Sequence, residues 1–149
     1  MSVLRLPFSN AETVSGLRAS GVARGTPLWF VLGFFRIITG LLFVFHGLSE
    51  LFGIPVAPYG GQTAAFLSWP HWWAGVIELI AGILVTVGFG TRVAALLCSG
   101  AMAYAYLVVH QKTGLWPIEN GGDLPILFCW SFFLIAFAGP GAFAIRRAL

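Results

Sequence analysis

The sequence predicts an all-α integral membrane protein, a bundle of four helices that cross the bilayer. Only 9% of its 149 residues are charged and 58% are apolar, whereas about 25% of the residues in an ordinary soluble domain are charged. Four long apolar runs follow one another along the chain, and Lys and Arg gather at alternate ends of those runs. These observations exclude a disordered chain, a nucleic-acid-binding protein and a disulfide-rich secreted scaffold, and they make the lipid bilayer the expected surroundings.

The chain divides into a polar tail of residues 1–27, a membrane domain of residues 28–145 and a short end of residues 146–149. The apolar runs of the membrane domain are residues 29–52, 72–89, 93–109 and 124–145. A helix needs ~20 apolar residues to cross the hydrocarbon core, with ~17 near the lower limit. No small-residue cleavage site follows the first run, so we expect it to be a retained anchor. The segment Gly139-Pro140-Gly141 is expected to kink or end the last helix early.

The connections and helix faces carry further signals. Segment 53–71 is rich in Pro and Gly but also apolar, so it is expected to fold back over the bundle, with residues 62–68 a candidate for a short interfacial helix. Small residues recur at intervals of seven in the first two predicted helices, a spacing that lets helix backbones approach closely. They are Gly33, Gly40, Gly47, Gly75 and Gly82.

Basic residues predict the orientation, because cytoplasmic loops carry an excess of Lys and Arg. Lys112 stands alone on one side of the predicted membrane, and six arginines lie on the other side: Arg5, Arg18, Arg24, Arg92, Arg146 and Arg147. An aromatic belt marks the outer interface: Tyr59, Trp69, Trp72, Trp73 and Trp116. We therefore expect both termini to face the cytoplasm.

Ionisable residues within or at the ends of the apolar runs are the candidate functional residues. They are Arg36, His46, Glu50, Glu78, His110 and Asp123. Each one at membrane depth costs at least ~2.5–3.5 kcal/mol on insertion scales, so each needs a reason to be there. With a rise of ~1.5 Å per residue, all except Arg36 fall in the outer half of the bilayer, at one common level.

Several roles remain open for these residues. His46 and Glu50 lie one turn apart on one helix face, and the common depth predicts that His46 and Glu78 form a buried pair. Such a pair is either a structural lock or a proton shuttle, since an imidazole titrates near neutral pH. Arg36 either extends toward the cytoplasmic interface or makes a structural pair, or it has a functional role. Asp123 is also a candidate cap for the last helix.

Metal and thiol chemistry have little support in the sequence. No spacing such as H-x-x-x-H or E-x-x-H occurs, so no metal site is predicted. Cys98 and Cys129 differ in predicted depth by ~10 Å, whereas the Cα atoms of a disulfide lie within ~7 Å of each other. Both cysteines are expected to be small buried residues.

Several segments together resemble the DoxX family over about residues 29–143. They are residues 36–40 (RIITG), 46–53 (HGLSELFG), 78–82 (ELIAG), 88–92 (GFGTR) and 120–123 (NGGD). The resemblance implies a small four-helix protein of a bacterial-type inner membrane. It carries functional positions over to Arg36, His46, Glu78 and His110, and to Asp123 where the family usually has Glu. A Lys is common where this chain has Glu50, which reverses the charge at that position.

Relatives of this kind are associated with thiosulfate:quinone oxidoreduction and with membrane complexes that handle oxidative and thiol stress. The preferred hypothesis is therefore a quinone-linked redox subunit in which His46 and Glu78 are catalytic and move protons. Arg36, Glu50, His110 and Asp123 would bind the ligand, a membrane quinone, and a membrane or redox protein partner or a small molecule would supply electrons. A scaffold subunit of a larger complex is an alternative, and so is a small transporter, which would need to form a homo-oligomer.

Overall fold

The computed structural model describes residues 22–58 and 60–145. Residues 1–21 of the tail, Tyr59 and residues 146–149 lie outside the described residues, so the expectations for them are not addressed by the structure. These residues include Arg5, Arg18, Arg146 and Arg147. All regular secondary structure within the described ranges is helical. The helices are α2 (Pro27–Phe52), α3 (His71–Val87), α4 (Thr91–Tyr104), α5 (Pro117–Asn120) and α6 (Asp123–Ala138). The predicted all-α fold is confirmed.

The helix ends follow from local sequence. Thr26 precedes α2, and its hydroxyl oxygen accepts a hydrogen bond of 3.3 Å from the backbone N–H of Trp29, as is usual for a residue at a helix N-cap. Gly53 ends α2 in the left-handed conformation with φ 68°, which a residue without a Cβ adopts at no steric cost. Helix α6 stops at Ala138, directly before Gly139-Pro140. The early end predicted for this helix is therefore confirmed.

The described part of segment 53–70, residues 53–58 and 60–70, contains no helix, so the candidate interfacial helix at residues 62–68 is absent. The segment instead runs in an irregular path over the end of α2. The backbone N–H of Ala64 donates to the carbonyl of Glu50 at 2.8 Å, and the hydroxyl of Ser49 donates to the carbonyl of Val56 at 2.9 Å. Its prolines and paired glycines interrupt regular hydrogen bonding, and these contacts to α2 hold it in place.

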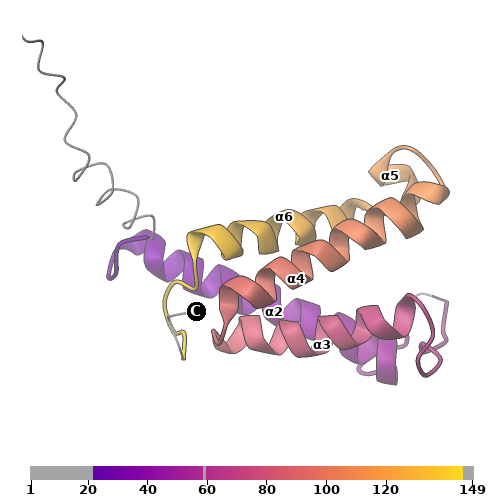
Figure 1. Cartoon of the computed structure of the whole chain (residues 1–149), viewed down its shortest axis with the longest axis horizontal. Coiled ribbons are helices and arrows are strands. Elements are labelled where there is room, and N and C mark those ends of the chain that lie inside the picture. Colours follow the sequence, from indigo (N-terminus) through magenta and orange to yellow (C-terminus); the bar gives the residue numbers. More distant parts are fainter. Residues whose placement is uncertain (1–21, 59, 146–149) are drawn as a thin grey trace, which may run out of the picture.

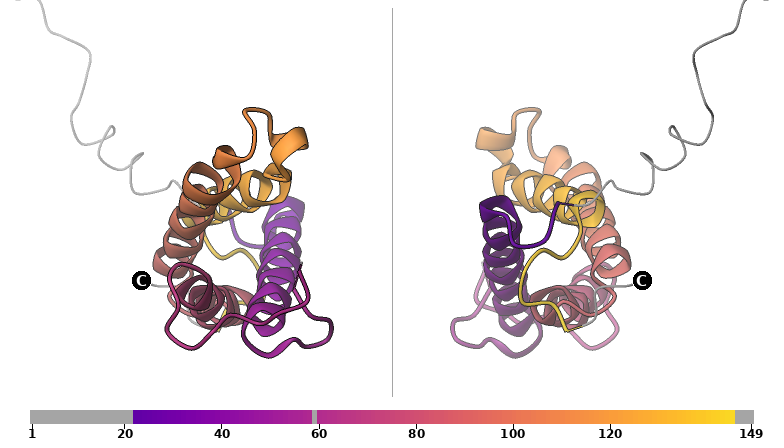
Figure 2. Two further views of the ribbon diagram at one scale, coloured as in Figure 1. Left: turned by 90° about the vertical axis from the view of Figure 1, so that its right-hand side faces the viewer. Right: turned by 90° about the vertical axis from the view of Figure 1, so that its left-hand side faces the viewer.

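The four longest helices surround a common core. Helix α2 packs along α3 and α4 packs along α6, while α3 and α4 join the two pairs and α2 meets α6 less extensively. Figure 1 shows the two pairs side by side, and Figure 2 shows the same helices end on, arranged as a ring. Fully buried apolar side chains fill the centre: Phe43, Val85, Cys98, Phe132 and Ile135.

The exterior of the bundle is apolar. In the part of the chain that the structure describes, two helical stretches are long and apolar enough to cross a membrane, Pro27–Phe52 and Thr91–Lys112, with mean hydropathies of 2.2 and 1.7. Helices α3 and α6 are also apolar but have 17 and 16 residues, at or just below the length needed for a span. Large apolar side chains such as Val93, Leu127 and Trp130 are exposed on these helices. A lipid environment accounts for such a surface.

Arg36 closes one end of the bundle. Its side chain is completely buried and donates hydrogen bonds to the carbonyls of Val85 at 2.6 Å, Pro140 at 2.7 Å and Ala142 at 3.0 Å, and also to that of Thr86. These carbonyls belong to the last turn of α3 and to the segment after α6. Of the roles considered for Arg36, the structure shows structural pairing, with backbone carbonyls as the partners.

Candidate functional site

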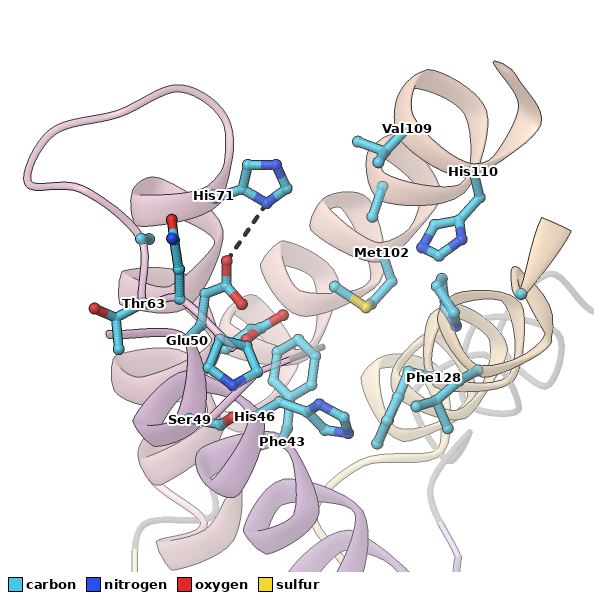
Figure 3. A pocket seen from close by; sticks show the side chains of 18 of the residues that line it. Phe43, His46, Ser49, Glu50, Thr63, His71, Met102, Val109, His110 and Phe128 are labelled. Carbon is cyan, nitrogen blue, oxygen red and sulfur yellow. Dashed lines mark ion pairs between the residues drawn. The ribbon is translucent and has the colours of Figure 1, made fainter. Parts of the chain in front are cut away.

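A cavity of about 800 Å³ occupies the end of the bundle opposite Arg36. Its wall is formed by the last turns of α2, the first half of α3, the end of the helical stretch Thr91–Lys112 and the first turns of α6. Segment 53–70 supplies the remaining side. Figure 3 shows the side chains that converge there from these elements. The volume is in the range of pockets that bind small molecules.

Four of the six predicted site residues line this cavity: His46, Glu50, Glu78 and His110. The prediction that they share one level is therefore consistent with the structure. Arg36 does not line the cavity, because it is buried at the closed end. Asp123 is also absent from the wall, although its neighbours Leu124 and Pro125 belong to it.

Asp123 does not cap α6. It is the first residue of the helix, the N-cap position is taken by Gly122, and no side chain makes a cap hydrogen bond. The side chain is exposed, and a carboxylate in the first turn of a helix still interacts favourably with the helix dipole. The expectation that Asp123 caps α6 is therefore wrong, because Asp123 lies one residue further into the helix than the N-cap position.

His46 lies against the aromatic wall of the cavity. Its imidazole meets the ring of Phe128 edge to face, with ring centroids 5.6 Å apart, and Phe128 in turn contacts Phe43 at 5.4 Å. Figure 3 shows the His46 ring directed from α2 toward Phe128 on α6. Among the described residues, His46 makes no ion pair with Glu78. The expected His46–Glu78 pair is therefore not formed, although both side chains border the same space.

Glu78 is a half-buried carboxylate on the wall. Within residues 22–58 and 60–145 it has neither a hydrogen-bond partner nor an ion pair. Burying a carboxylate without a partner is costly, so Glu78 requires water, a proton or a polar ligand from the cavity.

Glu50 is paired with a histidine that sequence reasoning missed. The Nδ1 atom of His71 lies 3.4 Å from Oε1 of Glu50, and the two side chains are 61% and 25% exposed. Both residues line the cavity, and Figure 3 marks the pair with a dashed line. His71 is the first residue of α3, at the outer level predicted for Glu50. Its position at this helix boundary was the signal in the sequence that could have identified it as a partner of Glu50.

His110 is directed into the cavity by an irregular helical turn. The segment Ala105–Val109 is a π-helix that follows α4, and single π turns inside α-helices are frequent at functional sites. Nδ1 of His110 lies 3.0 Å from the carbonyl oxygen of Asn120. Because a carbonyl only accepts, Nδ1 carries the proton, and the other ring nitrogen of a neutral imidazole is left as an acceptor.

The wall thus combines two chemistries. An apolar side is formed by Phe43, Met102 and Phe128, and a polar side carries three imidazoles and two carboxylates. Such groups can hold a flat ring against aromatic surfaces while hydrogen bonds or proton transfers occur at its edge. Across the described ranges, no three His, Cys, Asp or Glu side chains lie close enough together to hold a metal ion.

Comparisons with known proteins were made against families, curated proteins and solved structures. The family model described as DoxX matches residues 31–111. A protein of Haemophilus influenzae (strain ATCC 51907 / DSM 11121 / KW20 / Rd), named "Uncharacterized protein", is 37% identical over 123 residues, which cover 78% of this chain and 88% of that protein. The "Putative oxidoreductase CatD" of Bacillus subtilis (strain 168) is 27% identical over 110 residues, 74% of this chain and 80% of the relative. No solved structure matches the chain significantly.

Proposed function

The chain belongs to the DoxX family of membrane proteins, and on that basis we propose that it is a quinone-linked redox subunit of a bacterial-type inner membrane. The cavity beneath segment 53–70 would hold the quinone headgroup. The Bacillus subtilis relative bears the name of an oxidoreductase, which is the class of activity proposed here. The electron donor would be a redox protein partner or a small molecule.

The composition of the cavity wall is the observation that carries this proposal. A quinone headgroup is a flat apolar ring with two carbonyl oxygens, and it requires an apolar surface together with groups that supply protons at its edge. Phe43 and Phe128 provide aromatic surfaces, whereas His46 and Glu78 reach the same space from different helices. The half-buried Glu78 carboxylate, which has no partner among the residues that the structure describes, is consistent with a polar ligand in the cavity.

The chain's own residues would manage protons and position the ligand. A bound quinone supplies the redox chemistry, taking up two electrons and two protons on reduction, while the protein binds and orients it. His46 and Glu78 would act as the catalytic proton carriers, because imidazole and carboxyl groups are the usual general acids and bases of enzymes. His110 and Glu50 would contact the ligand from the wall.

The test uses the purified protein in lipid nanodiscs, with decylubiquinone as the quinone and thiosulfate as the test donor. Two thiosulfate ions form one tetrathionate ion and release two electrons. The quinone takes up these two electrons together with two protons and becomes the quinol. We expect His46→Ala combined with Glu78→Gln to lower turnover by about 100-fold or more, the usual contribution of general acid–base catalysis. Quinone reduction is followed by absorbance, and bound quinone is measured by extraction and mass spectrometry.

Glu119→Gln is the matched control. It removes an exposed carboxylate that lies outside the cavity wall, so turnover and bound quinone should stay at the parent level. The proposal fails if the parent protein neither retains nor reduces quinone, or if the double variant keeps its fold and both properties. Folding is checked by the helical circular dichroism signal and by gel filtration in detergent.

A further inference from the structure

His71 and Glu50 form a connected pair between solvent and the interior of the cavity. The exposed fraction falls from 61% for the side chain of His71 to 25% for that of Glu50, and Glu78, farther along α3, is half-buried. His46 lies one turn before Glu50 on α2, a spacing that places both side chains on one helix face. Ionisable groups therefore line the cavity from His71 to the aromatic wall, where His46 is itself exposed.

We propose that His71 and Glu50 are the proton entry of this cavity, a role that rests on the function proposed above. A proton on Nδ1 of His71 passes to the Glu50 carboxylate and leaves a neutral imidazole beside a neutral carboxylic acid. Glu50 then passes its proton onward to His46 or the ligand, and Nδ1 of His71 regains a proton from a hydronium ion of the solvent, which is left as water. The balance is one proton moved from solvent into the cavity, with no electron transferred by either residue.

The geometry brings the two groups within reach of each other. The separation of 3.4 Å between Nδ1 and Oε1 exceeds the usual length of an N–H···O hydrogen bond, about 2.7–3.2 Å, and catalytic hydrogen bonds are often long in enzymes without substrate and tighten when it binds. Both groups line the cavity wall. His71 is 61% exposed, so water reaches its imidazole.

Other ionisable groups around the pair complete the path. Glu50 faces His46 on its own helix and Glu78 on α3, and His110 borders the cavity from the end of the stretch Thr91–Lys112. The part of α6 that lines the cavity contributes Leu124, Pro125 and Phe128, none of which titrates. Protons that enter through Glu50 can therefore be accepted on α2, on α3 or at His110, but not on α6.

A structural role for the pair must be distinguished from a proton-transfer role. The pair joins the two ends of segment 53–70, since Glu50 precedes the segment and His71 follows it. The backbone of Glu50 also holds this segment through Ala64. A purely structural clamp would be lost with His71 and would not be restored by a small diffusible base.

The experiment measures the pH profile of kcat for thiosulfate-dependent reduction of decylubiquinone by the protein in nanodiscs. We expect His71→Ala to lower kcat by about tenfold or more toward the alkaline side of the profile, where proton supply limits the reaction. The KM for quinone should stay within about twofold, and added imidazole should restore most of the lost kcat. His71→Gln, which keeps a hydrogen-bonding side chain but cannot carry the proton, should behave like His71→Ala.

Two results would overturn the assignment. One is a kcat for His71→Ala that equals the parent value at every pH. The other is a loss of kcat that His71→Gln repairs and imidazole does not, since that pattern belongs to a structural clamp. A parent protein that neither binds nor reduces quinone refutes the proposed function itself, whereas parent turnover that survives the loss of His71 refutes only the proton entry.

Discussion

The Arg36 side chain supplies hydrogen-bond donors to the last turn of α3 and to the segment after α6. The last carbonyls of an α-helix have no partner within the helix, and Arg36 donates to those of Val85 and Thr86 and also to two carbonyls after α6. Its planar guanidinium presents several N–H groups in fixed directions, which an ammonium group does not. We therefore assign Arg36 to the stability of the closed end of the bundle.

Arg36→Met should lower the free energy of unfolding by about 3 kcal/mol or more, because it leaves buried carbonyls without donors. Arg36→Lys should give a smaller loss, since one ammonium group reaches fewer of these carbonyls. Denaturation in detergent micelles, followed by circular dichroism, measures both variants.

Arg92→Met provides the control, because Arg92 is exposed and donates to the carbonyls of Ala136 and Phe137 at the end of α6. Its loss should cost about 1 kcal/mol. An Arg36→Met protein as stable as the parent would contradict this role.

The sequence predicted the level of these ionisable residues in the bundle better than it predicted how they pair. Depth along a helix follows from residue number, so His46, Glu50, Glu78 and His110 could be placed at one level. Rotation about the helix axis and the choice of side-chain rotamer depend on the neighbouring helices. For that reason the expected His46–Glu78 pair is replaced by the contact between His46 and Phe128, and the pairing of Glu50 with His71 was missed.

At the scale of helices, glycines set the distance between α2 and α3. A Cβ atom added at Gly47 would lie 2.6 Å from the backbone nitrogen of Leu79 and 2.8 Å from the carbonyl oxygen of Gly75. These are backbone atoms, so the contact cannot be relieved by a side-chain rotation. The close packing predicted for the spaced glycines is confirmed at this position.

Gly47→Ala should therefore lower the free energy of unfolding by about 1–3 kcal/mol, the usual cost of overpacking. Gly100→Ala is the matched control, because no atom lies within 4 Å of its added Cβ. It should leave stability unchanged or raise it by up to about 1 kcal/mol through helix propensity. The two variants are compared by thermal denaturation in the same detergent, and an equal effect of both would disprove the packing argument.

Helix boundaries were predicted where a local signal exists. The first apolar run, residues 29–52, ends at the same residue as α2, and Gly139-Pro140 marks the end of α6. The π turn at Ala105–Val109 and the irregular path of residues 62–68 have no comparable local signal. Residues 62–68 are held by contacts with α2, such as the hydrogen bond from Ala64 to Glu50, which a single sequence does not show.

For the molecule as a whole, the positions of Lys and Arg predict that both termini face the cytoplasm. The turn between α3 and α4 lies at the same end of the bundle as the start of α2, and segment 53–70 lies at the other end (Figure 1). The cavity would then open toward the outer leaflet. This arrangement would place the proposed proton entry on the exoplasmic side of the membrane.

Cysteine labelling of intact cells tests this orientation. In a background with Cys98→Ala and Cys129→Ala, we expect a membrane-impermeant maleimide to label Gln111→Cys but not Ala23→Cys, both at exposed positions. Ala23→Cys should react only after the cells are opened. The opposite labelling pattern would invert the orientation and place the cavity on the cytoplasmic side.

The Arg36 contacts also determine how the bundle can move. One side chain joins α2, the end of α3 and the chain after α6, so these three parts are fastened together at a single point. The wall that His46 and Phe128 form belongs to the opposite end of the bundle. A change in access to that wall would therefore not require the Arg36 contacts to break.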